Sequence, residues 1–118
     1  MTADGKVRVH IKNNHASPDT FPPTPEGEAV FTITRERYEE TARRHPDVAE
    51  RIDAFIDWDL ENFYDSMKTA EALIAWDLPT ENLATTAPNL KWIQVTGAGV
   101  EHLCPMAWLP EGVTVRSE

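Results

Sequence analysis

The feature that most constrains the fold is the alternation of short apolar runs with helix-forming segments along the whole chain. Strands are predicted at residues 7–11, 53–58, 72–76, 90–95 and 113–115. Helices are predicted at residues 34–44, 47–51, 60–67, 80–86 and 102–108. Strands that alternate with helices at this spacing form βαβ units, whose parallel sheet carries helices on both faces. The sequence therefore predicts one α/β domain over residues 1–118, a flavodoxin-like doubly wound parallel sheet of about five strands.

Local signals predict how individual segments begin and which side chains are buried. Asp59 and Thr80 have side chains suited to cap the helices that follow them. The helix at residues 60–67 should bury one stripe, because its apolar side chains recur at i, i+3, i+4 and i+7; they are Leu60, Phe63, Tyr64 and Met67. Residues 13–27 contain four prolines and are predicted to form a loop without regular structure.

The charge balance argues against two classes of partner. The formal net charge is −9, from 20 acidic and 11 basic residues, which repels nucleic-acid phosphates and anionic membrane surfaces. The longest apolar run, residues 72–76, is far too short to span a bilayer. No signal peptide is visible at the N-terminus, and the single cysteine, Cys104, excludes an internal disulfide. We therefore expect a cytoplasmic protein that binds neither nucleic acid nor membranes.

The best candidate for a ligand site is the loop that follows the fourth predicted strand. Ligands of open α/β sheets bind at the carboxyl ends of the strands. Here Gly97 and Gly99 leave the backbone accessible, and the N–H groups of Ala98, Gly99 and Val100 could hold an anion at a helix start. The same glycines also suit a tight turn with no ligand, so both interpretations stay open on the loop alone.

Other candidate sites are weaker. A dinucleotide-binding G-x-G-x-x-G loop would need a glycine where His102 stands, and the remaining glycines are isolated. His102 and Cys104 are two residues apart, a spacing that points them to different faces of a helix, and no further ligand is nearby. We therefore predict no metal ligand, no nucleotide-binding residue and no catalytic residue in this chain.

The fourth strand and its loop carry a family resemblance. Residues 87–103 read APNLKWIQVTGAGVEHL and resemble the D-isomer-specific 2-hydroxyacid dehydrogenases. Residues 109–115, LPEGVTV, are similar to the next strand of that family. Residues 71–76, EALIAW, are similar to an earlier one, with Glu71 in place of the usual aspartate. The good match covers about residues 70–117, and the first 70 residues agree in topology only.

The resemblance implies the substrate-side domain of an NAD- or NADP-dependent oxidoreductase. Two backbone amides of the family's loop bind the substrate carboxylate, and here these belong to Ala98 and Gly99. Trp76 stands where family members contact the variable group of a small 2-oxo or D-2-hydroxy acid. The family's catalytic Arg, Glu and His, its Rossmann domain and its main homodimer interface all lie in sequence later than Glu118. This chain alone is therefore expected to be inactive.

Two other readings compete with this one. A receiver-like phosphoacceptor domain has the same topology, and Asp77 and Thr96 occupy suggestive positions. However, residues 12–14 read KNN where a receiver needs an acidic pair, and residues 116–118 read RSE where it needs a lysine. The chain could also be a flavodoxin-like binding or dimerisation module without enzymatic activity.

Overall fold

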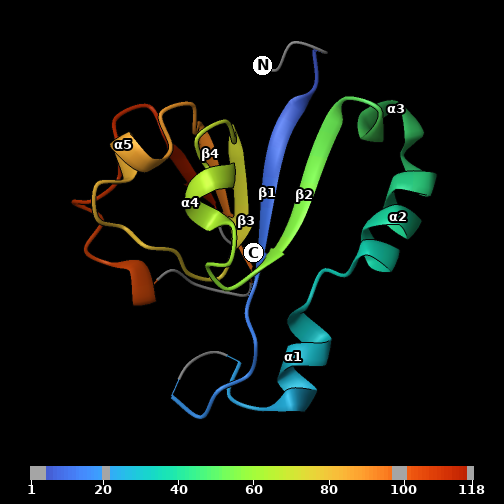
Figure 1. The fold of residues 1–118 in the computed structure, drawn as a ribbon, viewed down its shortest axis with the longest axis horizontal. Helices are drawn as coiled ribbons and strands as arrows, with labels where there is room; N and C mark the ends of the chain where they lie inside the picture. Colours follow the sequence, from blue (N-terminus) through green and yellow to red (C-terminus); the bar gives the residue numbers. More distant parts are fainter. Residues whose placement is uncertain (1–4, 20–21, 97–100, 117–118) are drawn as a thin grey trace.

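A computed structural model describes residues 5–19, 22–96 and 101–116, and its centre is a five-stranded sheet (Figure 1). All strand pairs are parallel, and the order across the sheet is β2-β1-β3-β4-β5. The strands are β1 (Val7–Asn13), β2 (Ile52–Trp58), β3 (Ala72–Ala75), β4 (Trp92–Val95) and β5 (Thr114–Arg116). This order is that of flavodoxin-like folds, and the predicted α/β class is confirmed.

Helices lie on both sides of the sheet, as predicted. On one side lie α1 (Pro25–Phe31), α2 (Arg35–Arg44) and α3 (Pro46–Ala49). On the other lie α4 (Phe63–Ser66) and α5 (Leu83–Thr86), followed by the 3-10 turn η1 (Glu101–Leu103). Each face has its own apolar cluster, because successive side chains of a strand point to opposite faces. Val9 and Ile11 belong to the cluster on the α2 side, whereas Phe63, Leu73 and Ile93 belong to the larger cluster on the α4 side.

The helix α1 begins inside the segment predicted to be a loop. Thr24 caps it by accepting a hydrogen bond from the backbone N–H of Gly27 (3.1 Å), and Pro25 occupies its first turn. A proline is well tolerated there, since the first N–H groups of a helix have no partner within the helix. The prediction that residues 13–27 form a loop throughout was therefore wrong for residues 25–27, which form the first turn of α1.

The segment after β2 differs most from its prediction. Asp59 is not a helix cap: its φ is +50°, and its carboxylate accepts hydrogen bonds from His15. The helix α4 is a single turn that starts at Phe63, with no side-chain cap from Asn62. Only half of the predicted stripe is buried, because Phe63 and Met67 are fully buried while Leu60 is 45% and Tyr64 52% exposed.

Further boundaries differ from those predicted; strand β4, for example, begins at Trp92 rather than near Leu90. The helix α5 begins at Leu83 rather than near Thr80, after Asn82 in a left-handed conformation (φ +55°) without a side-chain cap. In place of the helix predicted at residues 102–108, only the short turn η1 forms; Pro105 has no N–H with which to continue it. Strand β5 is displaced by one residue from the predicted 113–115.

Candidate functional site

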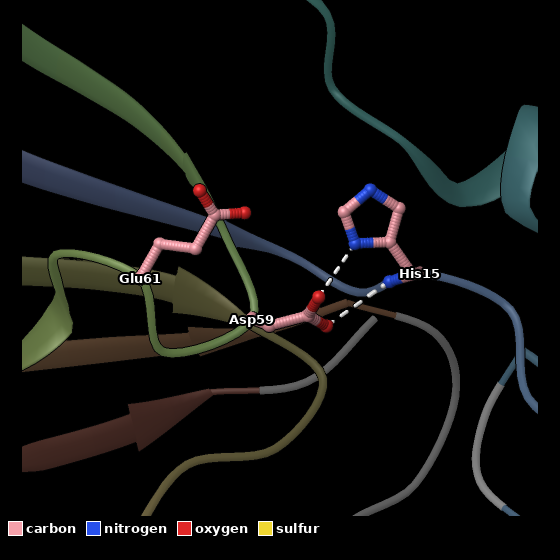
Figure 2. A group of neighbouring side chains, drawn as sticks. All are labelled: His15, Asp59 and Glu61. Carbon is pink, nitrogen blue, oxygen red and sulfur yellow. Dashed lines mark hydrogen bonds and ion pairs between the residues drawn. The ribbon is translucent and has the colours of Figure 1, made fainter.

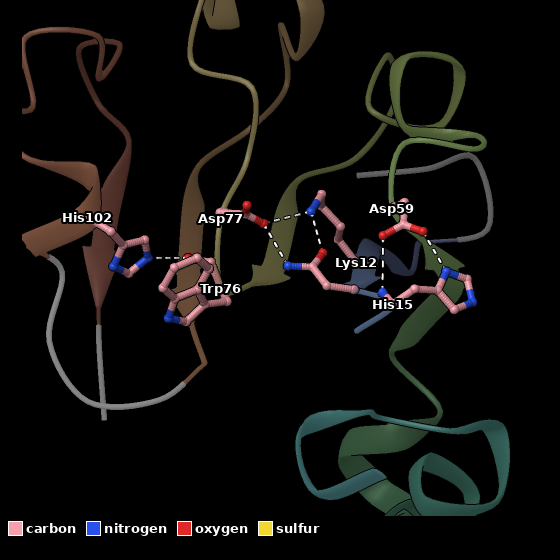
Figure 3. A network of polar contacts seen from close by, with 7 residues as sticks. Lys12, His15, Asp59, Trp76, Asp77 and His102 are labelled. Atoms are coloured by element: carbon pink, nitrogen blue, oxygen red, sulfur yellow. Dashed lines mark hydrogen bonds and ion pairs between the residues drawn. The ribbon is translucent and has the colours of Figure 1, made fainter. Parts of the chain in front are cut away.

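The loops at the carboxyl edge of the sheet bring together side chains from four strand ends. Residues 14–15 follow β1, residues 59–61 follow β2, Trp76 and Asp77 follow β3, and Thr96 follows β4. Carboxyl ends of parallel strands meet at one edge, which is where open α/β sheets bind ligands. The polar contacts there span the width of the central strands (Figure 3).

A buried lysine lies at the centre of this edge. Lys12 is the sixth residue of β1, its side chain is 6% exposed, and its Nζ lies 2.7 Å from Asp77 Oδ1 and 2.6 Å from Asn14 Oδ1. The Asn14 amide also donates to Asp77 Oδ1 (2.9 Å). Burying an ammonium group is costly unless a carboxylate compensates its charge. Asp77 therefore neutralises the charge of Lys12 within the site.

The same contacts bear on the receiver-like reading. A receiver would bind Mg²⁺ between acidic side chains, and here Lys12 and Asn14 occupy the positions around Asp77. Among the described residues, one group has the composition and spacing of metal ligands, and Asp77 does not belong to it. The network supports a structural role for Asp77 better than a phosphoacceptor role.

Trp76 lies at the carboxyl edge of the sheet, directly after β3. Its ring stacks on that of His102 with a centroid distance of 3.8 Å and an interplanar angle of 4°. His102 Nε2 also donates a hydrogen bond to the Trp76 carbonyl oxygen (2.5 Å). At the other side of the glycine loop, the Thr96 N–H donates to the carbonyl of Ala75 (3.0 Å). Both flanks of the loop are thus bonded to the end of β3, although Ala98 and Gly99 themselves lie outside the described residues.

A third group, formed by His15, Asp59 and Glu61, is one that sequence reasoning missed (Figure 2). His15 Nδ1 lies 2.5 Å from Asp59 Oδ2, and the His15 backbone N–H donates to Asp59 Oδ1 (3.1 Å). The His15 ring also stacks on Trp58, with centroids 4.3 Å apart. The sequence placed His15 in a loop and Asp59 at a helix start. The pairing of Asn13 with Trp58 across β1 and β2 is what brings the two together.

The contact between His15 and Asp59 shifts the pKa of both side chains. The hydrogen bond to Asp59 raises the pKa of His15 above its ordinary value. Burial acts to raise the pKa of Asp59, but the hydrogen bonds from the His15 side chain and backbone outweigh it, and the pKa is lowered. An exposed imidazole held by a carboxylate can exchange protons with a ligand or bind a metal ion.

A third histidine, His10, is buried and has no access to solvent. His10 in β1 is 0% exposed, and its Nδ1 is hydrogen-bonded to Ser66 Oγ (2.8 Å). Its Nε2 lies 3.6 Å from Asp57 Oδ2 and has no hydrogen-bond partner among the described residues. Burial lowers the pKa of His10 to about 4, against a smaller opposing effect of Asp57. His10 is therefore a neutral core residue at neutral pH rather than a ligand-binding group.

Two clefts border these groups. One of about 390 Å³ is lined by Lys12, His15, Asp59 and Asp77 among others. The second, of about 450 Å³, is lined by Trp76, Asp77, His102 and Cys104 among others. Asp77 and Leu78, which follow β3, line both clefts.

The described glycines do not form a dinucleotide-binding loop. Gly27 lies in α1, while Gly5 and Gly112 have positive φ in the segments before β1 and β5. None of the three lies in a loop between a strand and the helix that follows it, where phosphate-binding glycines are found.

No helix in the described part of the chain combines the length and apolarity needed to cross a bilayer.

Comparison with other proteins identifies no relative. Protein-family models, curated proteins and solved structures were each compared with this chain, and none of them matches it.

Proposed function

We propose that this chain forms the substrate-side wall of a cleft that binds a small 2-oxo or D-2-hydroxy carboxylate. In this proposal the cleft belongs to an NAD(P)-dependent oxidoreductase whose nucleotide-binding part lies outside these 118 residues. The observation that carries the proposal is the attachment of both flanks of the 96–102 loop to the end of β3. Thr96 bonds to Ala75, and His102 bonds to and stacks on Trp76.

This attachment supports the proposal that the loop amides and Trp76 bind the same substrate, as the resemblance implies. The amides of Ala98 and Gly99 belong to the loop whose flanks lie against β3, and Trp76 is the residue directly after β3. In this proposal the loop amides hold the carboxylate, and the indole of Trp76 contacts the remaining atoms of the same substrate. Backbone N–H groups hold carboxylates without a basic side chain, which suits a chain of net charge −9.

The position of Lys12 supports a backbone-based site in a second way. Lys12 places a cation at this edge, but its ammonium group is engaged by Asp77 and Asn14. A substrate carboxylate would have to displace Asp77 in order to pair with it. The residues of this chain would thus bind and orient the acid, which lowers the entropic cost of reaching a reactive geometry. Hydride transfer is supplied by the nicotinamide when it is bound, and the proton transfer by residues outside this chain.

The direct test is a titration of the ¹⁵N-labelled chain with pyruvate, followed by amide chemical shifts. We expect shifts concentrated at residues 96–102 and at the Trp76 indole N–H. Pyruvamide has the same shape without the negative charge and should leave these signals in place. Gly99→Val should abolish the shifts, because its side chain blocks the approach to the amides. Ala84→Val, an exposed position in α5, is the matched control and should respond as the wild type does.

Two outcomes would count against this site. If pyruvate and pyruvamide gave the same shifts, the loop would not recognise a carboxylate. If Gly99→Val retained the wild-type response, the amides of the loop would not be the ligand. Absence of any response, with the chain folded, would favour the reading of a binding or dimerisation module without a substrate.

A second prediction concerns Trp76. Trp76→Ala should weaken pyruvate binding by about threefold to tenfold, since a contact worth about 1 kcal/mol corresponds to this range. Trp76→Phe should restore part of the affinity because it keeps an aromatic face. The control is Trp92→Ala, at the start of β4 on the opposite edge of the sheet, where the side chain is 41% exposed. Equal losses of affinity in Trp76→Ala and Trp92→Ala would contradict a role of Trp76 in binding.

A further inference from the structure

We propose that His15, Asp59 and Glu61 bind one divalent transition-metal ion of the zinc class. This site is independent of the carboxylate site proposed above, because its residues follow β1 and β2 rather than β3 and β4. The inference rests on the combination of an imidazole with two carboxylates, on their spacing and on their charge (Figure 2).

The donor set has the composition of known metal sites. Imidazole nitrogen suits Zn²⁺, Co²⁺, Ni²⁺ and Cu²⁺, and carboxylate oxygen completes mixed nitrogen–oxygen sites. The three ligand atoms all lie within 4.8 Å of one another. In a tetrahedral site with bonds of about 2.1 Å, any two ligand atoms are about 3.4 Å apart. The most widely separated pair therefore needs to approach by up to about 1.4 Å, and the exposed side chain of Glu61 can supply this movement by rotation.

The ring of His15 is already held in place. Trp58 stacks on it, and the His15 backbone N–H is bonded to the carboxylate of Asp59. His15 and Asp59 come from separate loops, and the parallel pairing of β1 with β2 fixes their approach. A bound ion would thus cost little ordering of the histidine and the aspartate. Only Glu61 would lose side-chain freedom on binding, a cost of about 2 kcal/mol or less.

The local charge favours a cation. Among the described residues, no lysine or arginine forms an ion pair with Asp59 or Glu61. Two carboxylates therefore face a single imidazole. A bound ion takes the place of the proton between His15 Nδ1 and Asp59 Oδ2, and the ring then ligates through Nδ1 and keeps its proton on Nε2. Three protein ligands leave coordination positions open, and the 390 Å³ cleft is lined by both His15 and Asp59.

The experiment is isothermal titration calorimetry of the 118-residue chain with Co²⁺, Zn²⁺ and Mg²⁺ at pH 7.5. We expect one Zn²⁺ or Co²⁺ per chain and much weaker binding of Mg²⁺, because Mg²⁺ prefers oxygen ligands and keeps its waters. Bound Co²⁺ should also give visible absorption bands and quench the fluorescence of Trp58, which lies against His15. In Trp58→Phe the ion should still bind and most of the quenching should be lost.

Ligand variants test which residues hold the ion. His15→Ala, Asp59→Asn and Glu61→Gln should each lower the Zn²⁺ affinity by at least about tenfold. Asparagine tolerates the positive φ of residue 59, so Asp59→Asn is expected to fold. His45→Ala removes an exposed histidine at the end of α2 and should leave the affinity unchanged. The proposal is overturned if the wild type shows no saturable Zn²⁺ or Co²⁺ binding, or if His15→Ala and Asp59→Asn bind as tightly as the wild type.

Discussion

Replacing Phe63 by alanine is expected to lower the free energy of unfolding by about 3–5 kcal/mol. Phe63 is 0% exposed in the larger apolar cluster, where it packs against the sheet from α4. Its ring also meets that of His10 edge-on, with centroids 5.5 Å apart. Truncation would remove this buried surface and leave a cavity that a one-turn helix cannot close. Urea unfolding followed by circular dichroism measures the effect.

The matched control is the next residue along the same turn. Tyr64 is 52% exposed, and its ring meets that of Phe63 edge-on with centroids 5.5 Å apart. Tyr64→Ala should therefore cost less than about 1.5 kcal/mol. The sequence assigned both residues to one buried stripe, which would give similar losses. Comparable destabilisation by the two variants would show that the packing described for α4 is wrong.

Stability should fall by about 3 kcal/mol as the pH decreases from above 6.5 to below 4, through the protonation of His10. Burial lowers the pKa of this side chain from 6.5 to about 4 in the folded protein. The unfolded chain therefore binds more protons between these two values, and each unit of pKa difference corresponds to about 1.4 kcal/mol. The contribution of neutral His10 is fully present above pH 6.5 and is lost as the pH falls through about 4.

Two charged groups near His10 modify the pKa shift that burial causes. Asp57, which is also buried, acts to raise the pKa of His10, and Lys12 acts to lower it. His10→Leu should remove this part of the pH dependence, so the difference in stability between the two proteins should change by about 3 kcal/mol over the window. If His10→Leu does not fold, NMR titration of the wild-type imidazole gives the pKa directly. A His10 pKa at or above 6.5 would refute the prediction.

The residues around β2 show how far sequence reasoning reached. Periodicity found the strand and one turn of the helix predicted after it, Phe63–Ser66, because alternating and helical patterns are local. It could not find that Asp59 turns back toward His15, since this depends on β2 lying beside β1. The two residues are 44 positions apart, and nothing between them specifies the strand order. The candidate metal ligands were missed for this reason.

The sequence by itself determined the α/β class, the number of strands and most of their positions. The physical reason is that an apolar run of strand length between helical segments has few other stable arrangements. The sequence also placed the glycine loop and Trp76 directly after two neighbouring strands. Only the tertiary structure decided which side chains meet at the sheet edge: Lys12 with Asp77, Trp76 with His102, and His15 with Asp59. These contacts join residues far apart in the chain, so they arise from strand order and packing rather than from any local pattern.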